Sequence, residues 1–236
     1  MQHLKKNELK PHLSKYWKIP PDKNASFVAA MEDVLAVYAR QYDPDFPVVC
    51  MDESSVQLIG EVHKPIPAAC GHPVLMDDEY VRNGVASILL EVEPLAGMRN
   101  VKITERRTRV DWAQYIKEML DERYPTAKKV VLVMDNLNTH NAASLYEAFV
   151  PEEACRLADR LEIHYTPKHG SWLDIAEIEL SVLKRQCLAN RIATIEKLRA
   201  DVSVWNSNRN NRQTKVNWQF TTKESRIKLK RLYPTF

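Results

Sequence analysis

The stretch Lys129-Lys-Val-Val-Leu-Val-Met-Asp135-Asn-Leu-Asn-Thr-His140 is the strongest structural signal in the chain. Five apolar residues, three of them β-branched, run directly into Asp135 and a polar turn. This pattern is typical of a buried central strand whose end carries function. A buried carboxylate is costly unless a partner compensates its charge. We therefore expect Asp135 to face a cation, a basic group or a water-filled cleft.

A second aspartate follows the same pattern earlier in the chain. Pro47-Val-Val-Cys-Met-Asp52 is again an apolar run that ends at a carboxylate, so Asp52 and Asp135 are candidates for one site. A single aspartate after a strand is more often a turn residue, and only the joint placement favours metal binding. Mg²⁺ and Mn²⁺ prefer oxygen ligands, and two such ions about 3.5–4 Å apart support in-line displacement at phosphorus.

The bulk properties indicate one main domain. The chain has 236 residues, of which 44% are hydrophobic, enough for one good core. It has no apolar run long enough to cross a membrane and no apolar signal segment in its Lys-rich N-terminus, so we expect a cytoplasmic protein. The four cysteines are far apart and form no Cys-x-x-Cys pair, which favours reduced thiols over a zinc site.

The order of the predicted elements indicates an α/β fold. Apolar patterns predict strands at 48–52, 56–59, 84–93, 101–104, 130–134 and 161–165, and helices at 25–42, 108–124, 142–160 (interrupted at Pro151) and 173–188. Several strands followed by alternating helices and strands predict a mixed sheet with helices on both faces. This is the order of a ribonuclease-H-like fold.

A third carboxylate is expected on the last of these helices. At 100° per residue, Asp174 and Glu177 share a polar face beside the main apolar stripe, whereas Glu179 falls on the opposite polar strip. A glutamate beside a core stripe is usually a solvated surface residue. Spacing alone therefore favours Glu177 over Glu179 only weakly.

Positive charge is concentrated near the C-terminus. Residues 209–236 hold eight Lys or Arg and one acidic residue, against a net charge of +3 for the whole chain. A solvated basic helix over 222–231 is one interpretation. Binding of phosphate backbone through Arg226, Lys228, Lys230 and Arg231 is favoured, because aromatic residues interleave with the basic ones.

Three ordered blocks carry a resemblance to a known family. Met51-Asp-Glu53, Asp135-Asn-Leu-Asn-Thr-His140 and Tyr165-Thr-Pro-Lys-His-Gly-Ser-Trp-Leu-Asp-Ile-Ala-Glu177-Ile-Glu resemble the signature blocks of DDE transposases from bacterial insertion sequences related to the mariner elements. The resemblance extends from about Val48 to the basic tail. It implies a ribonuclease-H-like, retroviral-integrase-like catalytic domain with a five-stranded mixed sheet, and it assigns Asp52, Asp135 and Glu177 as the catalytic, metal-binding triad. Asp174 departs from the pattern, because relatives often carry Asn there.

The resemblance also divides the chain. It implies a linker arm and short helix over 1–45, the catalytic domain over 46–205 and a basic helical tail over 206–236. Full-length relatives carry an N-terminal helix-turn-helix region that recognises terminal inverted repeats, and we expect the first 45 residues to correspond to the linker that follows it.

Further residues are candidates for DNA contact or support. The loop before the Glu177 helix holds Lys168, His169 and Trp172, which either hold the scissile phosphate and stack on a base or form a packed loop. His140 and Asn136 follow Asp135 and either orient a phosphate or water or are turn residues. Arg106, Arg107 and Arg109 precede a helix and either contact the DNA backbone or form a solvated cluster.

These features together predict an enzyme that cuts and joins DNA. The expected cofactor is a pair of Mg²⁺ or Mn²⁺ ions, and the expected partners are double-stranded terminal inverted repeats, target DNA and a second copy of the chain. The resemblance places the protein in a bacterial cytoplasm, associated with the nucleoid when bound to DNA. Two alternatives stay open: a catalytically inactive or truncated DNA-binding remnant, and a ribonuclease-H-like nuclease that does not join strands.

Overall fold

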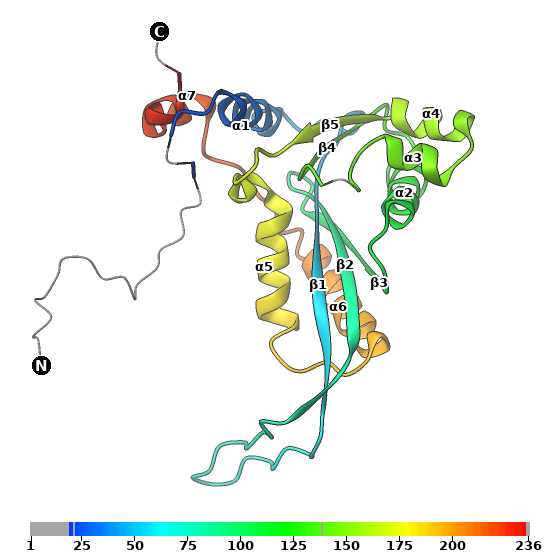
Figure 1. Cartoon of the computed structure of the whole chain (residues 1–236), viewed down its shortest axis with the longest axis vertical. Coiled ribbons are helices and arrows are strands. Elements are labelled where there is room, and N and C mark those ends of the chain that lie inside the picture. The colour runs from blue at the N-terminus through cyan, green and yellow to red at the C-terminus, as the bar shows by residue number, and fades with distance from the viewer. Residues whose placement is uncertain (1–18, 21, 138, 235–236) are drawn as a thin grey trace, which may run out of the picture.

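The computed structural model describes residues 19–20, 22–137 and 139–234, and it forms a five-stranded mixed sheet with helices on both faces (Figure 1). The strand order is β3-β2-β1-β4-β5. The strands are β1 (Val48–Glu61), β2 (Tyr80–Glu93), β3 (Met98–Thr104), β4 (Val130–Met134) and β5 (Leu161–Tyr165). β1, β2 and β3 pair antiparallel, whereas β4 and β5 run parallel to β1. The predicted fold class is confirmed.

The central strands are buried on both faces, and their alternation sorts side chains between two cores. Cys50 and Val133 belong to the core under α5 (Ile175–Cys187) and α6 (Ile195–Asn211). Met51 and Met134 belong to the opposite core, formed with α2 (Arg109–Glu118), α3 (Ala143–Ala148) and α4 (Pro151–Asp159). Because strand side chains alternate between faces, the next residue of each strand points back toward α5.

Helix α1 (Ala25–Tyr38) lies beside β5 and next to the C-terminal helix α7 (Thr222–Lys228) (Figure 1). Asn24 caps α1 by accepting a hydrogen bond from the Phe27 N–H at 2.9 Å. The Asn24 N–H in turn donates to the Leu232 carbonyl at 3.0 Å. The segment predicted as a basic tail therefore packs on the body of the protein through α1.

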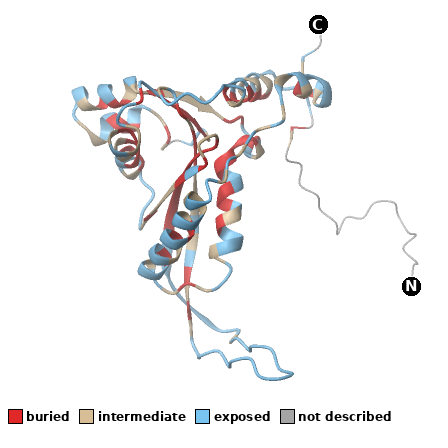
Figure 2. Ribbon diagram, turned by 180° about the vertical axis from the view of Figure 1, so that it is seen from behind, coloured by how far each residue is buried: buried red, intermediate tan, exposed pale blue. Residues whose placement is uncertain are grey.

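A long hairpin extends away from the rest of the molecule (Figure 1). β1 and β2 have 14 residues each, and their outer halves lose the covering helices, so the burial pattern of β2 changes from exposed to buried along its length. Figure 2 shows the hairpin end as exposed, in contrast to the buried inner sheet. The exposed large apolar side chains of this arm are Val62, Ile66, Val74, Leu75, Met76, Tyr80, Val81 and Val85.

Several predicted boundaries were wrong. The two strands expected at 48–52 and 56–59 are one continuous strand, because Ser54 and Ser55 pair with β2 as the apolar residues do. The helix expected over 25–42 ends at Tyr38, and the helix expected over 108–124 changes at Met119–Arg123 into a π-helical turn. Helix α6 was not predicted. It includes residue 205, at which the predicted catalytic domain ends. The arm expected over the first 24 residues lies mostly outside the described residues.

No helix within the described part of the chain is long and apolar enough to cross a membrane.

Candidate active site

Strand register brings the two aspartates together. Met51 of β1 pairs with Met134 of the parallel strand β4, so Asp52 and Asp135 follow at neighbouring positions. Both have the parity of residues that face α5, because Cys50 and Val133 lie in the core under that helix. Met134 pairs in turn with Tyr165 of β5, so the loop that begins at Thr166 starts at the same edge of the sheet.

Helix α5 brings a third carboxylate to this edge. Asp174 is its N-cap and accepts a hydrogen bond from the Ala176 N–H at 2.8 Å. Glu177 lies in the first turn and is exposed. Glu179 is 2% exposed and bonds with Arg99, whose Nε lies 2.9 Å from Glu179 Oε2. Of the two glutamates weighed from the sequence, only Glu177 is open to a ligand.

Several carboxylates lie close enough together between these elements to raise one another's pKa. The pKa of Asp52 is raised to about 6, mainly by burial and also by the charges of Asp135, Glu177 and Glu53, against a hydrogen bond from the Glu53 N–H that lowers it. Burial and the charge of Asp52 hold the pKa of Asp174 well above its usual range. The Oδ2 atom of Asp174 is buried without a hydrogen-bond partner among the described residues. An acidic cluster of this kind favours a cation.

His140 fixes the orientation of Asp135. Its Nδ1 lies 2.7 Å from Asp135 Oδ1, and its Nε2 lies 3.7 Å from Glu53 Oε2. The imidazole is fully buried and stacks on Trp112, with ring centroids 5.9 Å apart. Burial alone would lower the pKa of His140, but the bonds with Asp135 and Glu53 raise it to about 9. His140 is therefore a positively charged partner for two carboxylates at neutral pH.

Glu53 was missed as a site residue, although it directly follows Asp52. Its side chain is 3% exposed and lies 3.0 Å from the guanidinium of Arg107. These contacts form one line in which positive and negative side chains alternate, namely Arg107, Glu53, His140 and Asp135. This line ties the loop before α2 to the end of β4.

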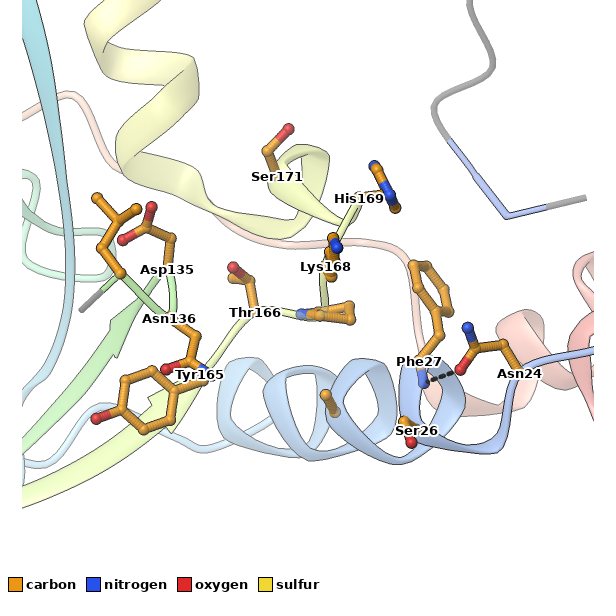
Figure 3. Close-up of a pocket in the computed structure, with 13 residues that line it drawn as sticks. Asn24, Ser26, Phe27, Asp135, Asn136, Tyr165, Thr166, Lys168, His169 and Ser171 are labelled. Atoms are coloured by element: carbon orange, nitrogen blue, oxygen red, sulfur yellow. Dashed lines mark hydrogen bonds between the residues drawn. The ribbon is translucent and has the colours of Figure 1, made fainter. Parts of the chain in front are cut away.

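The loop between β5 and α5 is held in one tight conformation. The Gly170 N–H donates to the Pro167 carbonyl at 2.7 Å, and a Cβ at Gly170 would lie 2.4 Å from Pro167 Cγ. His169 has φ = 65°, in the left-handed region that few side chains adopt. Lys168 and His169 are both exposed and line a cleft that reaches Asp135 and Asn136 (Figure 3). The structure thus brings four of the predicted residues to one cavity.

Comparison with known proteins shows the family of the chain. The family model of the DDE superfamily endonuclease matches residues 47–199, which is more than half of the chain. The chain belongs to the DDE superfamily endonucleases. This confirms the resemblance found in the three sequence blocks. No curated protein matches the chain.

Solved structures similar to this DDE superfamily endonuclease come from the Mos1 mariner transposase. The Mos1 catalytic domain matches with a TM-score of 0.54 and 12% identity, over 83% of this chain and 90% of that chain. The Mos1 paired-end complex with the left transposon end matches with a TM-score of 0.56 and 14% identity, over 86% of this chain. A Mos1 paired-end complex with Mn matches with a TM-score of 0.54 and 15% identity, over 86% of this chain and 64% of that chain. The chain spans 62% of the length of the paired-end complex protein.

The remaining residues of the endonuclease that were predicted to contact DNA differ in their burial and in their partners. Trp172 is partly buried and packs edge-on against Phe220, with ring centroids 5.8 Å apart. Arg109 forms an ion pair with Glu147, whereas Arg106 is exposed. These contacts of Trp172 fit the interpretation of a packed loop, which the sequence left open.

The C-terminal basic residues are exposed but partly engaged within the endonuclease. Arg226 bonds to Glu32 of α1 at 2.7 Å, and Arg231 donates to the Pro20 carbonyl at 2.7 Å. Lys228 forms an ion pair with Glu224 at 3.0 Å, and Lys230 is exposed. The contact with Glu32, which lies 194 positions from Arg226, was not predictable from the sequence.

The carboxylates of the endonuclease lie near one another, but among the described residues they do not form a ready metal site. Within residues 19–20, 22–137 and 139–234, no three His, Cys, Asp or Glu side chains are arranged to hold a metal ion as they stand. The donor set nevertheless suits a hard divalent cation, because it consists of carboxylates with excess negative charge and an orphaned buried oxygen on Asp174.

Proposed function

We propose that this chain is the catalytic part of a transposase that cuts and joins DNA with divalent metal ions. One observation carries the proposal. The register of β1 and β4 places Asp52 and Asp135 side by side, facing the exposed Glu177, and the charges of Asp135 and Glu177 raise the pKa of Asp52. This arrangement lies within the residues matched by the DDE superfamily endonuclease model.

Each site residue has a definite task in this proposal. Asp52, Asp135 and Glu177 would hold two Mg²⁺ or Mn²⁺ ions after small side-chain rotations toward a common point. Bound ions of this kind activate the attacking hydroxyl and stabilise the leaving oxygen. His140 keeps the Asp135 carboxylate in one orientation, because its ring is buried and stacked. Lys168, exposed in the loop before α5, neutralises charge on the scissile phosphate.

The expected partners are inverted-repeat ends, target DNA and a second copy of the chain. The names of the similar Mos1 complexes, with paired transposon ends and in strand transfer, support DNA as the substrate. The hairpin arm supports a dimer, because its exposed apolar side chains form a protruding surface that a second copy would cover. Action in the bacterial cytoplasm at the nucleoid belongs to the same proposal.

The test is a cleavage and joining assay on labelled DNA that carries the element's own ends. We expect products only with Mg²⁺ or Mn²⁺, and loss of both products in Asp135→Asn and Glu177→Gln. Glu196→Gln is the matched control, because Glu196 is also an exposed glutamate in the first turn of a helix. Cleavage that persists in Glu177→Gln would overturn the triad. Hydrolysis without joining would reduce the function to that of a nuclease.

A further inference from the structure

Strand β3 forms one edge of the sheet, and a side chain of α6 caps its outer side at Arg99. The Arg99 N–H donates to Asn210 Oδ1 at 2.9 Å, and Asn210 Nδ2 donates to the Arg99 carbonyl at 2.8 Å. The Asn210 amide therefore takes the place that a neighbouring strand would occupy beside Arg99.

These two bonds show which backbone groups of β3 face away from the sheet. In an antiparallel pair, residues whose N–H and C=O bond to the partner strand alternate with residues whose groups point outward. Because Arg99 points away from β2, Val101 and Ile103 do so too, whereas Asn100 and Lys102 face β2. Within the described part of the chain, no hydrogen bond joins the backbone of Val101 or Ile103 to a group outside the sheet. Beyond the capped position, the strand thus presents open donors and acceptors.

A groove of about 360 Å³ runs along these open groups, between β3 and α6. Its helical side is lined by Arg199, Ser203 and Asn206, which share one face of α6 with Asn210 because they are spaced by four, three and four residues. Asn206 Oδ1 is buried and has no hydrogen-bond partner among the described residues. An occupant of the groove can therefore hydrogen-bond to the strand on one side and to the helix on the other.

The lining defines the chemistry of the occupant. Open N–H and C=O groups along a strand edge are complementary to an extended peptide backbone. The described lining residues include two basic side chains, Lys102 and Arg199, and no acidic one. Lys102 is paired with Glu118, so the charge that an occupant meets is mainly that of the exposed Arg199. The groove therefore suits a short extended segment that carries an acidic side chain.

A second copy of the chain suits this edge less well. Pairing of two β3 edges would bring the same basic residues from both copies into one interface. Like charges in a shared interface disfavour association. Charge complementarity thus favours a different protein as the partner.

We propose that the groove between β3 and α6 is a docking site for an acidic, extended peptide segment of another protein, which adds to the five-stranded sheet as a sixth strand beside Val101 and Ile103. An acidic side chain of the segment pairs with Arg199, and a donor of the segment bonds to Asn206 Oδ1. The inference goes beyond the proposed function, because docking requires neither DNA nor metal. Strand β2 separates β3 from the strand that carries Asp52, so a docked segment leaves the carboxylate site open.

The test begins with a display library of random peptides of about seven residues, close to the length of a typical strand, selected on the full chain. Peptides that also bind Val101→Pro are removed. Proline at this position removes an outward N–H and no bond to β2, and edge strands tolerate proline at such positions. We expect the remaining peptides to be acidic and to bind Val101→Pro about tenfold more weakly, as the loss of one backbone donor predicts. Failure to recover any peptide that distinguishes the two proteins would overturn the inference.

Backbone methylation of a selected peptide separates strand addition from simple charge attraction. Methyl groups on every second backbone nitrogen block one edge of the peptide strand, and methyl groups on the alternate nitrogens block the other edge. We expect one methylated peptide to lose at least about tenfold in affinity and the other to stay within about twofold of the parent. Equal affinities of the two methylated peptides would contradict the proposal.

Amide hydrogen exchange locates the bound peptide on the protein. The amides of Val101 and Ile103 should exchange at least about tenfold more slowly when the peptide is bound, because they become hydrogen-bonded. Those of Asn100 and Lys102 already bond within the sheet and should change by less than about twofold. Unchanged exchange at Val101 and Ile103 with the peptide bound would place the binding site elsewhere.

A matched pair of variants tests the charge. Arg199→Glu should weaken binding of the acidic peptide about tenfold. Arg185→Glu makes the same change at an exposed arginine of α5 that does not line the groove, and its affinity should stay within about twofold of the unsubstituted protein. Equal effects of the two substitutions would refute the role of Arg199. Thermal unfolding verifies that each variant remains folded.

Sedimentation of the unsubstituted protein and of Val101→Pro tests the other occupant. The two proteins should have the same oligomeric state. A change of oligomeric state in Val101→Pro would assign the edge to a second copy of the chain and overturn the inference. Failure of metal-dependent cleavage would overturn the proposed function alone, because none of these binding measurements needs cleavage.

Discussion

Replacement of Glu179 by Gln should separate folding from catalysis on a single helix. Glu179 lies two positions from Glu177 on α5, yet its side chain is only 3% exposed. Its Oε2 accepts from Arg99 Nε at 2.9 Å. Its Oε1 accepts from Arg99 at 3.0 Å and from Arg209 at 2.6 Å. These bonds join β3, α5 and α6 beneath the site.

The size of the expected destabilisation follows from the burial of Glu179 and its two arginine partners. The Arg99 side chain is fully buried and also donates to the Thr214 carbonyl at 2.6 Å, so it cannot leave to reach solvent. Breaking a buried ion pair from one side costs about 3–5 kcal/mol. Glutamine keeps one acceptor oxygen, which favours the lower end, about 3 kcal/mol. For a chain of this size the melting temperature should fall by roughly 6–12 °C.

The assay combines urea unfolding, followed by tryptophan fluorescence, with Mn²⁺ binding followed by electron paramagnetic resonance. Glu179→Gln should unfold at lower urea concentration and still bind Mn²⁺ at a temperature where it is folded. Glu177→Gln should lose Mn²⁺ binding and keep its melting temperature within about 2 °C, since exposed substitutions have small effects. A melting temperature for Glu179→Gln within 2 °C of the unsubstituted protein would refute the reasoning, and so would equal loss of Mn²⁺ in both variants.

Two further predictions concern the site loop and the buried imidazole. Because the folded pKa of His140, about 9, exceeds its ordinary 6.5, its stabilisation is complete below pH 6.5 and is lost as the pH rises through 9. In metal-free buffer this loss of stability should reach at most about 3 kcal/mol. His140→Gln should flatten the dependence of the unfolding free energy on pH between pH 6.5 and 9. An unchanged slope in the variant would show that other groups cause the pH dependence. Gly170→Ala should shift the loop, because a Cβ would lie 2.4 Å from Pro167 Cγ, and should lower metal-dependent cleavage several-fold in the assay on labelled DNA. Cleavage equal to that of the unsubstituted protein would show that the loop adapts.

The parts of the fold that were predictable from the sequence are those encoded by local patterns. Strand β5 begins and ends where the apolar pattern predicts, and β4 ends at Met134, directly before Asp135, as expected. Short buried strands bounded by turns carry their signal within a few residues. The two aspartates were predictable for the same reason, since each directly follows a short apolar run, although Asp52 lies within the longer strand β1.

The parts that were missed depend on contacts between distant segments. A helical wheel places Glu179 on a polar strip, and only Arg99, 80 positions away, makes that position buried. Helix α6 carries the spacing Leu198, Val202 and Trp205 after its cap Thr194, but most of its other residues are polar and mask the pattern. The sequence likewise shows the charge of Arg226 without its partner Glu32.

The hydrogen bond between Asn24 and Leu232 has a consequence for how the protein is made. Helix α1 leaves the ribosome early, but the segment that packs on it is synthesised last. At about 5–20 residues per second, the stretch from Asn24 to Leu232 takes roughly 10 to 40 s to translate. The nascent chain therefore completes the carboxylate-bearing strands and α5, with α1 joined to them through the Tyr38–Leu173 and Asp33–His164 contacts, before the C-terminal segment is available. The packing of that segment on α1 is the last of these contacts to form.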